Sequence, residues 1–255
     1  MILIFYGGYM KIYFLADKNP EATKALYACI KKYGQADLAE ADVVIALGGD
    51  GFMLKTLQAL LNYKIPVFGL NFGHVGYLLN SYNAENLPER VESARSVRLL
   101  PLVVNAQTYD GQIIHEYAFN DFSLTRQSPQ AARLSVVITD RKNGKRFVSQ
   151  ESVFGDGLVV ATASGSTGYY SAAGGIPFSQ KEGGIGVKAI CCKTNYNPIV
   201  SKEAHIVVTP QESKKRPIHL DCDGKKRFSN IATACIEAEP TKVQTLLLER
   251  KANSY

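Results

Sequence analysis

A buried-strand segment that runs straight into a glycine turn is the feature that most limits how this chain can fold. Residues 42–47 (DVVIAL) are apolar from residue 43 onward, the pattern of a strand covered on both faces of a parallel sheet. Glycines follow, and helical periodicity then begins at residue 52. The same alternation recurs nearby, with strands expected over 11–16 and 65–71 and helices over 19–34, 52–61 and 83–94. It predicts a right-handed parallel sheet flanked by helices.

The second half of the chain has a different texture, with short apolar strands separated by turns. The segments YDGQ (109–112) and KNGK (142–145) carry the Asp-Gly and Asn-Gly chemistry of two-residue hairpins. We therefore expect two domains: an α/β N-terminal domain over residues 1–98, and an all-β sandwich over 99–237. The tail, 238–255, is expected to return to the first domain.

The charge balance argues against nucleic acid and membrane partners. Lys plus Arg (29) exceeds Asp plus Glu (23), giving a net charge of +6, but the surplus is spread along the chain without a basic stripe. No apolar run reaches the ~18 residues needed to span a bilayer. The apolar start, residues 1–10, lacks the basic region of a signal peptide, and Met10 as the effective first residue is a hypothesis that mass spectrometry would test.

The five cysteines indicate a reducing compartment. Their odd number and the absence of a CxxC pair do not suggest a disulfide framework, so we expect reduced thiols in a cytoplasmic protein. The four histidines show no ligand spacing with these cysteines along the sequence. A structural zinc site is therefore not expected.

The glycine turn itself, Gly48-Gly49-Asp50-Gly51, has two interpretations. Glycines after a buried strand allow close backbone approach, and the following helix offers free N–H groups to an anion. Alternatively, the turn is merely tight and Asp50 caps the helix. These residues alone leave both open. The P-loop pattern G-x-x-x-x-G-K-[ST] is absent, and the spacing is not that of a Rossmann loop.

A second block, residues 154–175 (FGDGLVVATASGSTGYYSAAGG), joins an apolar strand to a loop of glycines and small hydroxyl residues. Its amides and hydroxyls could contact phosphate or ribose oxygens, and Tyr169 and Tyr170 offer ring faces to a base. A flexible surface loop is the alternative. A long loop inside a compact domain is usually functional, which favours the binding interpretation.

Two shorter segments are weaker signals. In FNDFSLTR (119–126), adjacent residues Asn120 and Asp121 can reach one ligand together only near a strand end or bulge, and turn chemistry explains them equally well. In LNFGHVGYLL (70–79), His74 lies in a glycine-rich turn, where a structural role is more common than a catalytic one. No G-x-S-x-G segment occurs, which disfavours covalent hydrolase chemistry.

These four segments, in this order, resemble the NAD kinases, which phosphorylate NAD to NADP. The resemblance covers roughly residues 11–235. The GGDG turn alone is weak evidence, because diacylglycerol kinases, sphingosine kinases and 6-phosphofructokinases carry similar loops. The block at 155–175 is far more specific. It implies an α/β domain and a β-sandwich domain with NAD bound between them. It also implies ATP or polyphosphate as phosphoryl donor, a divalent cation such as Mg²⁺, and a homodimer or homotetramer.

The resemblance also assigns roles to particular residues. Asp50 matches the proposed proton acceptor, with Gly48 and Gly49 beside the donor phosphates, while no metal ligands are assigned. The positions expected to bind NAD are Gly51, Tyr77, Asn120, Asp121, Asp156, Ser164, Thr167, Gly168, Tyr169, Tyr170, Ser171 and Ala172.

The chain departs from the family pattern at four positions. Phe52 stands where Thr is common, Asp121 where Glu is common, Gly168 where Ala is usual, and Lys225 where Gln commonly follows an Asp-Gly pair. The loss of a hydroxyl at position 52 is the one feature that favours a non-catalytic dinucleotide sensor. A lipid kinase of the diacylglycerol or sphingosine type is the other alternative.

Overall fold

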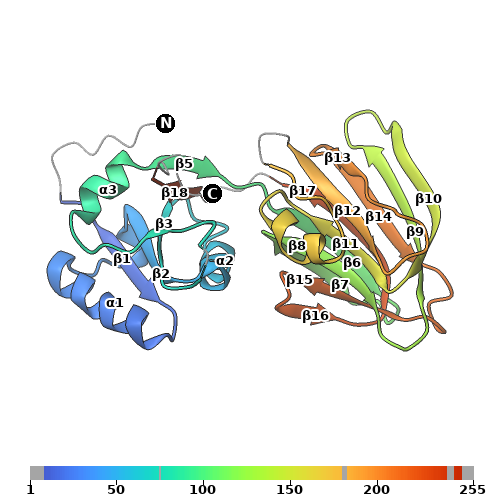
Figure 1. Ribbon diagram of the computed structural model, residues 1–255, viewed down its shortest axis with the longest axis horizontal. Helices are drawn as coiled ribbons and strands as arrows, with labels where there is room; N and C mark the ends of the chain where they lie inside the picture. The colour runs from blue at the N-terminus through green and yellow to red at the C-terminus, as the bar shows by residue number, and fades with distance from the viewer. Residues whose placement is uncertain (1–8, 75, 180–182, 240–243, 249–255) are drawn as a thin grey trace. The chain divides into compact units, whose positions relative to one another are not determined.

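The computed structural model describes residues 9–74, 76–179, 183–239 and 244–248. The chain divides into two compact units, which we call the N-terminal unit (Met1–Leu99 with Pro240–Tyr255) and the β unit (Leu100–Glu239). The boundaries expected from sequence, after residues 98 and 237, lie within two residues of these. Figure 1 shows the elements of each unit.

The sheet of the N-terminal unit is mixed. Its three central strands, β1 (Ile12–Ala16), β2 (Val43–Gly48) and β3 (Val67–Asn71), pair in parallel as predicted, and the short β4 (Asn80–Ser81) also runs parallel to β3. The tail returns as β18 (Gln244–Leu247), which pairs in parallel with β3 and antiparallel with β5 (Arg95–Arg98). The expectation of a purely parallel sheet is thus correct for the central strands and wrong at the β5 edge.

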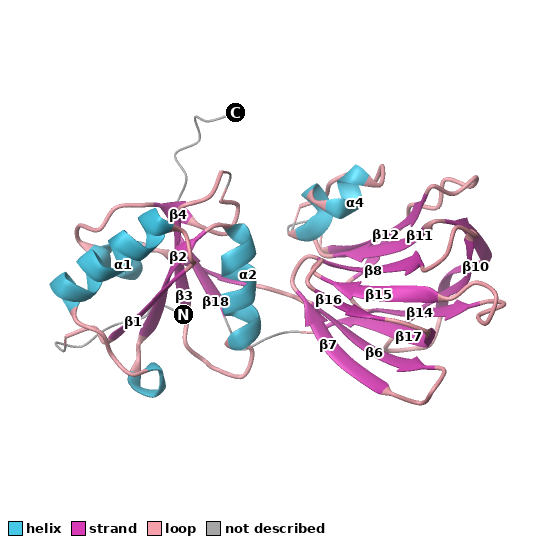
Figure 2. Cartoon of the chain, turned by 90° about the horizontal axis from the view of Figure 1, so that it is seen from below, coloured by secondary structure: helices cyan, strands magenta, loops and turns pink. Residues whose placement is uncertain are grey.

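Helices cover both faces of this sheet (Figure 2). The helices are α1 (Pro20–Tyr33), α2 (Asp50–Ala59) and α3 (Leu87–Ser93), with a short 3-10 turn, η1 (Leu38–Glu40). The ends of α1 are set as predicted: the Asn19 side chain accepts the Glu21 N–H, and Gly34 ends the helix at φ 79°. The helix predicted from residue 83 begins only at Leu87, because Asn86 adopts a left-handed conformation (φ 52°).

The β unit consists of two six-stranded antiparallel sheets, in agreement with the predicted sandwich. One sheet has the order β10-β9-β14-β17-β6-β7 and the other β13-β12-β11-β8-β15-β16. The bounds are β6 Leu102–Thr108, β7 Ile113–Ala118, β8 Asp121–Arg126, β9 Ala132–Asp140, β10 Arg146–Gly155, β11 Gly157–Ala161, β12 Gly184–Ile190, β13 Ile199–Ser201, β14 Ala204–Pro210, β15 Ile218–Cys222, β16 Lys226–Phe228 and β17 Ile231–Ala238.

Alternation along the strands builds the core of the sandwich. On β14, Ile206 and Val208 are buried in one cluster with Leu124 and Leu158 of the facing sheet. The residues that alternate with them on β14, such as His205, point away from the core because successive side chains lie on opposite faces of a strand. The sheet that contains β14 therefore has an outer face whose side chains are not part of the sandwich core.

The glycine-rich block between β11 and β12 has a small core of its own. It forms a 3-10 turn, η2 (Gly165–Thr167), and a short helix, α4 (Tyr169–Ala172). Tyr170 and Phe178 from this block pack with Val159 and Ile190 of the sheet below. The block is therefore folded against the sheet over residues 162–179, and the alternative of an unanchored surface loop does not describe it.

Candidate functional site

The GGDG turn joins β2 to α2, and Asp50 is the first residue of the helix. Gly49 occupies the N-cap position and makes no side-chain cap, so Asp50 is not the cap that one interpretation proposed. Instead, its Oδ2 accepts the N–H of Gly76 (3.0 Å) and its Oδ1 accepts the N–H of Leu78 (3.2 Å). Two backbone donors from the loop after β3 therefore fix the carboxylate at the start of α2.

Glycines allow these two loops to meet. A Cβ on Gly73 would lie 2.9 Å from the Cα of Gly49, closer than real Cβ atoms approach backbone. Gly76 needs its positive φ of 77°, and a Cβ there would lie 2.6 Å from the Asn71 amide nitrogen. Larger side chains at these positions would displace the loop after β3 and break the two hydrogen bonds that its N–H groups donate to Asp50.

Phe52 turns back over the glycine turn. Its side chain is half-buried, and a Cβ added to Gly48 would lie 2.7 Å from the Phe52 ring. The residue that replaces the family's usual threonine thus packs against the first glycine of the loop. On the neighbouring loop, Tyr77 is half-exposed and His74 is exposed.

The β unit contains a cavity of about 830 Å³ that runs along β8 and is also lined by residues of β12, β15 and β16 and of the turn before β11. Four predicted NAD-binding residues line it: Asn120, Asp121, Asp156 and Tyr169. The Asp-Gly pair that precedes Lys225, Asp223 and Gly224, also lines it. So do residues that the sequence did not single out: Ser123, Thr125, Arg126, Gln127, Ser128, Pro129, Ile190, Asp221 and Arg227. The pairing of β8 with β15, which sequence spacing does not reveal, brings the two groups together.

Asn120 and Asp121 lie where both can face one ligand. Asp121 is the first residue of β8 and Asn120 directly precedes it, which meets the strand-end condition. The glycine-rich block abuts them: the Thr162 N–H bonds the Asn120 carbonyl (2.9 Å), and a Cβ on Gly165 would lie 2.1 Å from that oxygen. Two segments identified separately in the sequence thus form one site.

Three carboxylates of this site differ in how they are compensated. Asp223 accepts the backbone N–H groups of Phe119, Asn120 and Asp121 at 2.8–3.2 Å. Asp221 forms a bidentate pair with Arg227 at 2.6 and 3.0 Å. Within the described part of the chain, no cation or N–H group bonds the carboxylate of Asp121, which is 8% exposed.

Burial raises the pKa of two of these carboxyl groups, Asp121 and Asp223. It raises the pKa of Asp121 to about 7, with the negative charges of Asp223 and then Asp221 adding to the effect. The pKa of Asp223 is also raised by burial, although its three N–H donors oppose the shift. Burial and the nearby Asp121 raise the pKa of the half-exposed Tyr169. At neutral pH, Asp121 can therefore present either a proton donor or an acceptor to a ligand.

The remaining predicted residues are spread around the block. Tyr170 is fully buried, donates its hydroxyl to Asn197 Oδ1 (2.7 Å) and packs edge-on against Phe178. It supports the block from below and does not line the cavity, which differs from the expectation that its ring faces a base. Thr167, Gly168 and Ala172 are exposed, and Ser164 and Ser171 are half-buried.

Asp156 pairs with Arg126 at 2.6 Å, and both side chains are partly exposed. Among the described residues, no helix has the length and apolar character to cross a membrane.

Comparison with protein families gives two matches that together cover most of the chain. Residues 12–94 match the model of the ATP-NAD kinase N-terminal domain, and residues 124–238 match that of the ATP-NAD kinase C-terminal domain. Asp50 lies in the first range and Asp156, Tyr169 and Asp223 in the second, whereas Asn120 and Asp121 lie between the two.

Curated relatives agree over nearly the whole length. The chain is 35% identical to an NAD kinase of Hyphomonas neptunium over 248 residues, covering 94% of this chain and 92% of the relative. It is 38% identical to an NAD kinase of Cereibacter sphaeroides, with the same coverage.

Two solved structures share the fold at low identity. The yeast NADH kinase in complex with NADH matches with a TM-score of 0.79 at 19% identity, covering 99% of this chain and 86% of that one. The Archaeoglobus fulgidus NAD kinase in complex with ATP matches with a TM-score of 0.74 at 22% identity, covering 95% and 94%. With both domain matches and relatives above 30% identity along 94% of its length, this chain belongs to the NAD kinase family.

Proposed function

We propose that this protein transfers the terminal phosphoryl group of ATP, or of polyphosphate, to the 2′-hydroxyl of the adenosine ribose of NAD, forming NADP. Its relatives are named NAD kinases, and the two solved structures hold NADH and ATP. The observation that carries the proposal in this chain is the carboxylate of Asp50, fixed by two backbone donors beside a glycine turn.

Asp50 is proposed to act as the proton acceptor. A carboxylate oxygen has two lone pairs, so the bonds from Gly76 and Leu78 orient each oxygen and leave a further lone pair for the ribose hydroxyl. As the hydroxyl oxygen bonds to the γ-phosphorus, its proton passes to Asp50 and the bond to the β-phosphate oxygen breaks. Such general-base assistance is worth about 10²–10⁴-fold in rate.

The glycines supply the donor side of the proposed site. Gly49 leaves part of the turn accessible, although Gly48 is buried at the end of β2 against Phe52, and the N-terminus of α2 favours anionic groups such as phosphates. A divalent cation such as Mg²⁺ would be held by oxygen ligands, with Asp50, the carboxylate of this turn, joining the donor phosphates. Bound there, the ion would neutralise charge on the phosphoryl group.

The cavity of the β unit is proposed to bind the dinucleotide. Asn120 offers an amide with both donors and an acceptor, Asp121 offers a carboxyl that titrates near neutral pH, and Tyr169 offers a half-exposed ring. The serine and threonine hydroxyls and the exposed Gly168 of the block at 164–172 flank Tyr169 in the chain and could complete the pocket for ribose and phosphate oxygens.

We extend the proposal to a cytoplasmic homodimer or homotetramer. Its support is the family resemblance together with five cysteines that are all unbridged thiols, as expected in a reducing compartment. Light scattering coupled to size-exclusion chromatography would measure the assembly.

One assay tests the proposed reaction. The protein is incubated with NAD, ATP and MgCl₂, and NADP is measured with an NADP-specific dehydrogenase; parallel reactions replace ATP with polyphosphate and NAD with NADH. NADP formation that Asp50→Asn abolishes supports the proposal. NAD binding without turnover would instead indicate a dinucleotide sensor, and phosphorylation of diacylglycerol or sphingosine would indicate a lipid kinase.

A further inference from the structure

Three residues of metal-ligating type meet on the outer face of the sheet that contains β14 and β17. His205 on β14 lies directly opposite Glu237 on β17, and Cys235 precedes Glu237 by two residues on the same face. In the described part of the chain, their ligand atoms form a group within 4.8 Å of one another. The cysteine and the histidine are 30 residues apart in sequence, so linear spacing conceals a cluster that strand pairing creates.

The sulfur–nitrogen separation in the cluster is close to that of zinc ligands, whereas the carboxylate–imidazole separation is shorter. Zinc binds histidine nitrogen, thiolate sulfur and carboxylate oxygen at about 2.0–2.3 Å, which places neighbouring ligand atoms roughly 3.3–3.7 Å apart. Cys235 Sγ lies 3.6 Å from His205 Nε2 and 3.8 Å from His205 Nδ1. Glu237 Oε1 lies 2.6 Å from His205 Nδ1, a hydrogen bond that holds the imidazole ring in place.

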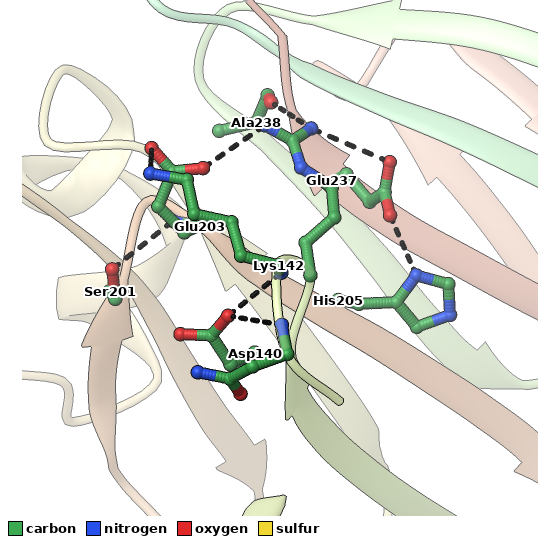
Figure 3. Close-up of polar contacts among 9 residues, drawn as sticks. Asp140, Lys142, Ser201, Glu203, His205, Glu237 and Ala238 are labelled. Carbon is green, nitrogen blue, oxygen red and sulfur yellow. Dashed lines mark hydrogen bonds and ion pairs between the residues drawn. The ribbon is translucent and has the colours of Figure 1, made fainter. Parts of the chain in front are cut away.

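The surroundings orient Glu237 from its far side, as Figure 3 shows. Arg141 Nη1 lies 3.7 Å from Glu237 Oε2, leaving Oε1 turned toward His205. The positive charges of Arg141 and Lys142 are met by Glu203, at 3.2 and 3.6 Å. A second carboxylate thus offsets the cations that would otherwise repel a metal ion near Glu237.

Partial exposure gives an ion access to the cluster. The side chains of His205 and Glu237 are 37% and 21% exposed, and Cys235 is half-buried. The opposite faces of the same strands are packed into the sandwich core, with Ile206 and Ile236 fully buried, so the scaffold beneath the three side chains is rigid.

We propose that His205, Cys235 and Glu237 bind one zinc-class divalent ion, with the fourth position open to solvent. For one ion to contact all three side chains, the ligand nitrogen is Nδ1, which lies 2.6 Å from Glu237 Oε1 and 3.8 Å from Cys235 Sγ. Glu237 then moves outward by about 1 Å to admit the ion, His205 carries its proton on Nε2, and the thiol proton is released as the Zn–S bond forms. Such an ion links two neighbouring strands of the β unit. The site uses none of the residues assigned to NAD, Asp50 or the donor, so it stands independently of the proposed reaction.

Metal titration of the whole protein tests the site. The wild-type chain is stripped with EDTA, dialysed, and titrated with ZnCl₂ against a chromophoric competing chelator. We expect one tight equivalent in the wild type, and a loss of affinity of at least about 100-fold in Cys235→Ser and in His205→Gln. Cys191→Ser, which removes an exposed thiol of the same unit outside the cluster, is the matched control and should bind as the wild type does.

Cobalt gives a second readout that does not depend on affinity. A Co²⁺-loaded wild-type protein should show the thiolate-to-metal charge-transfer absorption of a cysteine ligand, and Cys235→Ser should lose it while circular dichroism shows the fold intact. Absence of a tight zinc equivalent in the wild type would overturn the proposal. So would binding in Cys235→Ser and His205→Gln equal to that of the wild type.

Discussion

The protonation of Asp121 gives a quantitative test of the dinucleotide cavity. Its pKa in the folded chain is about 7, against an ordinary value of 3.8, because burial and two neighbouring carboxylates disfavour the charged form. A raised carboxyl pKa means that the folded state binds the proton more tightly than the unfolded state does. The contribution of the protonated Asp121 carboxyl to stability is therefore fully present below pH ~4 and is lost as pH rises through ~7.

The size of this effect follows from the shift. One pKa unit corresponds to about 1.4 kcal/mol, so the difference between about 7 and 3.8 corresponds to ~4 kcal/mol of unfolding free energy. Asp121→Asn keeps the shape and removes the titration. The measured quantity is the unfolding free energy of the variant minus that of the wild type. From pH 4 upward this difference should increase by ~1.4 kcal/mol per pH unit, and above pH 7 it should level off ~4 kcal/mol above its pH 4 value.

Urea denaturation of both proteins between pH 4 and pH 8 measures this difference, with hydrogen exchange of peptides from β8 identifying the transition of the β unit. Asp156→Asn is the control, because Asp156 lines the same cavity but is partly exposed and paired with Arg126. Removing such a pair should change stability by no more than ~1 kcal/mol. A stability difference between Asp121→Asn and the wild type that stays flat across this range would refute the argument that the carboxyl is buried and uncompensated.

Three further predictions concern the proposed reaction. Asp50→Asn should lower turnover by at least about 10² while NAD affinity stays within several-fold, because the amide cannot accept the proton; equal turnover would remove Asp50 from that role. Asn120→Ala should mainly weaken NAD binding, and unchanged affinity by calorimetry would contradict the assigned contact. Gly73→Ala places a Cβ 2.9 Å from Gly49 Cα and should displace the loop that orients Asp50, lowering kcat more than NAD affinity. A Gly73→Ala variant with wild-type kcat would show that the loops tolerate separation.

Local patterns in the sequence predicted what depends on local interactions. The central strands and α1 are set by runs of apolar residues, by the Asn19 cap and by Gly34, all visible within a few residues of chain. The role of Asp50 could not be settled that way, because its partners Gly76 and Leu78 lie 26 and 28 residues away.

Long-range pairing also hid most of the cavity. Asp223 bonds the backbone of Asn120 from 103 residues away, and Asp221 reaches the site only because β15 pairs with β8. Tyr170 does not line the cavity for a related reason: adjacent tyrosines on a single helical turn point in different directions, and of the two only Tyr169 lines it. A sequence pattern can therefore identify the segment that forms a site, whereas tertiary packing determines which of its side chains face the cavity.

The tail strand has a consequence for how the molecule is made. β18 lies between β3 and β5, and Asn80 holds it with bonds to the Leu246 carbonyl (3.0 Å) and the Leu248 N–H (2.8 Å). The sheet that presents Asp50 therefore cannot complete its strand order until residues 244–248 have left the ribosome, after the entire β unit has been synthesised. The continuous β unit can fold first, while the N-terminal unit waits for its last strand. Nascent chains cut short before residue 244 would thus carry the GGDG turn on an unfinished sheet.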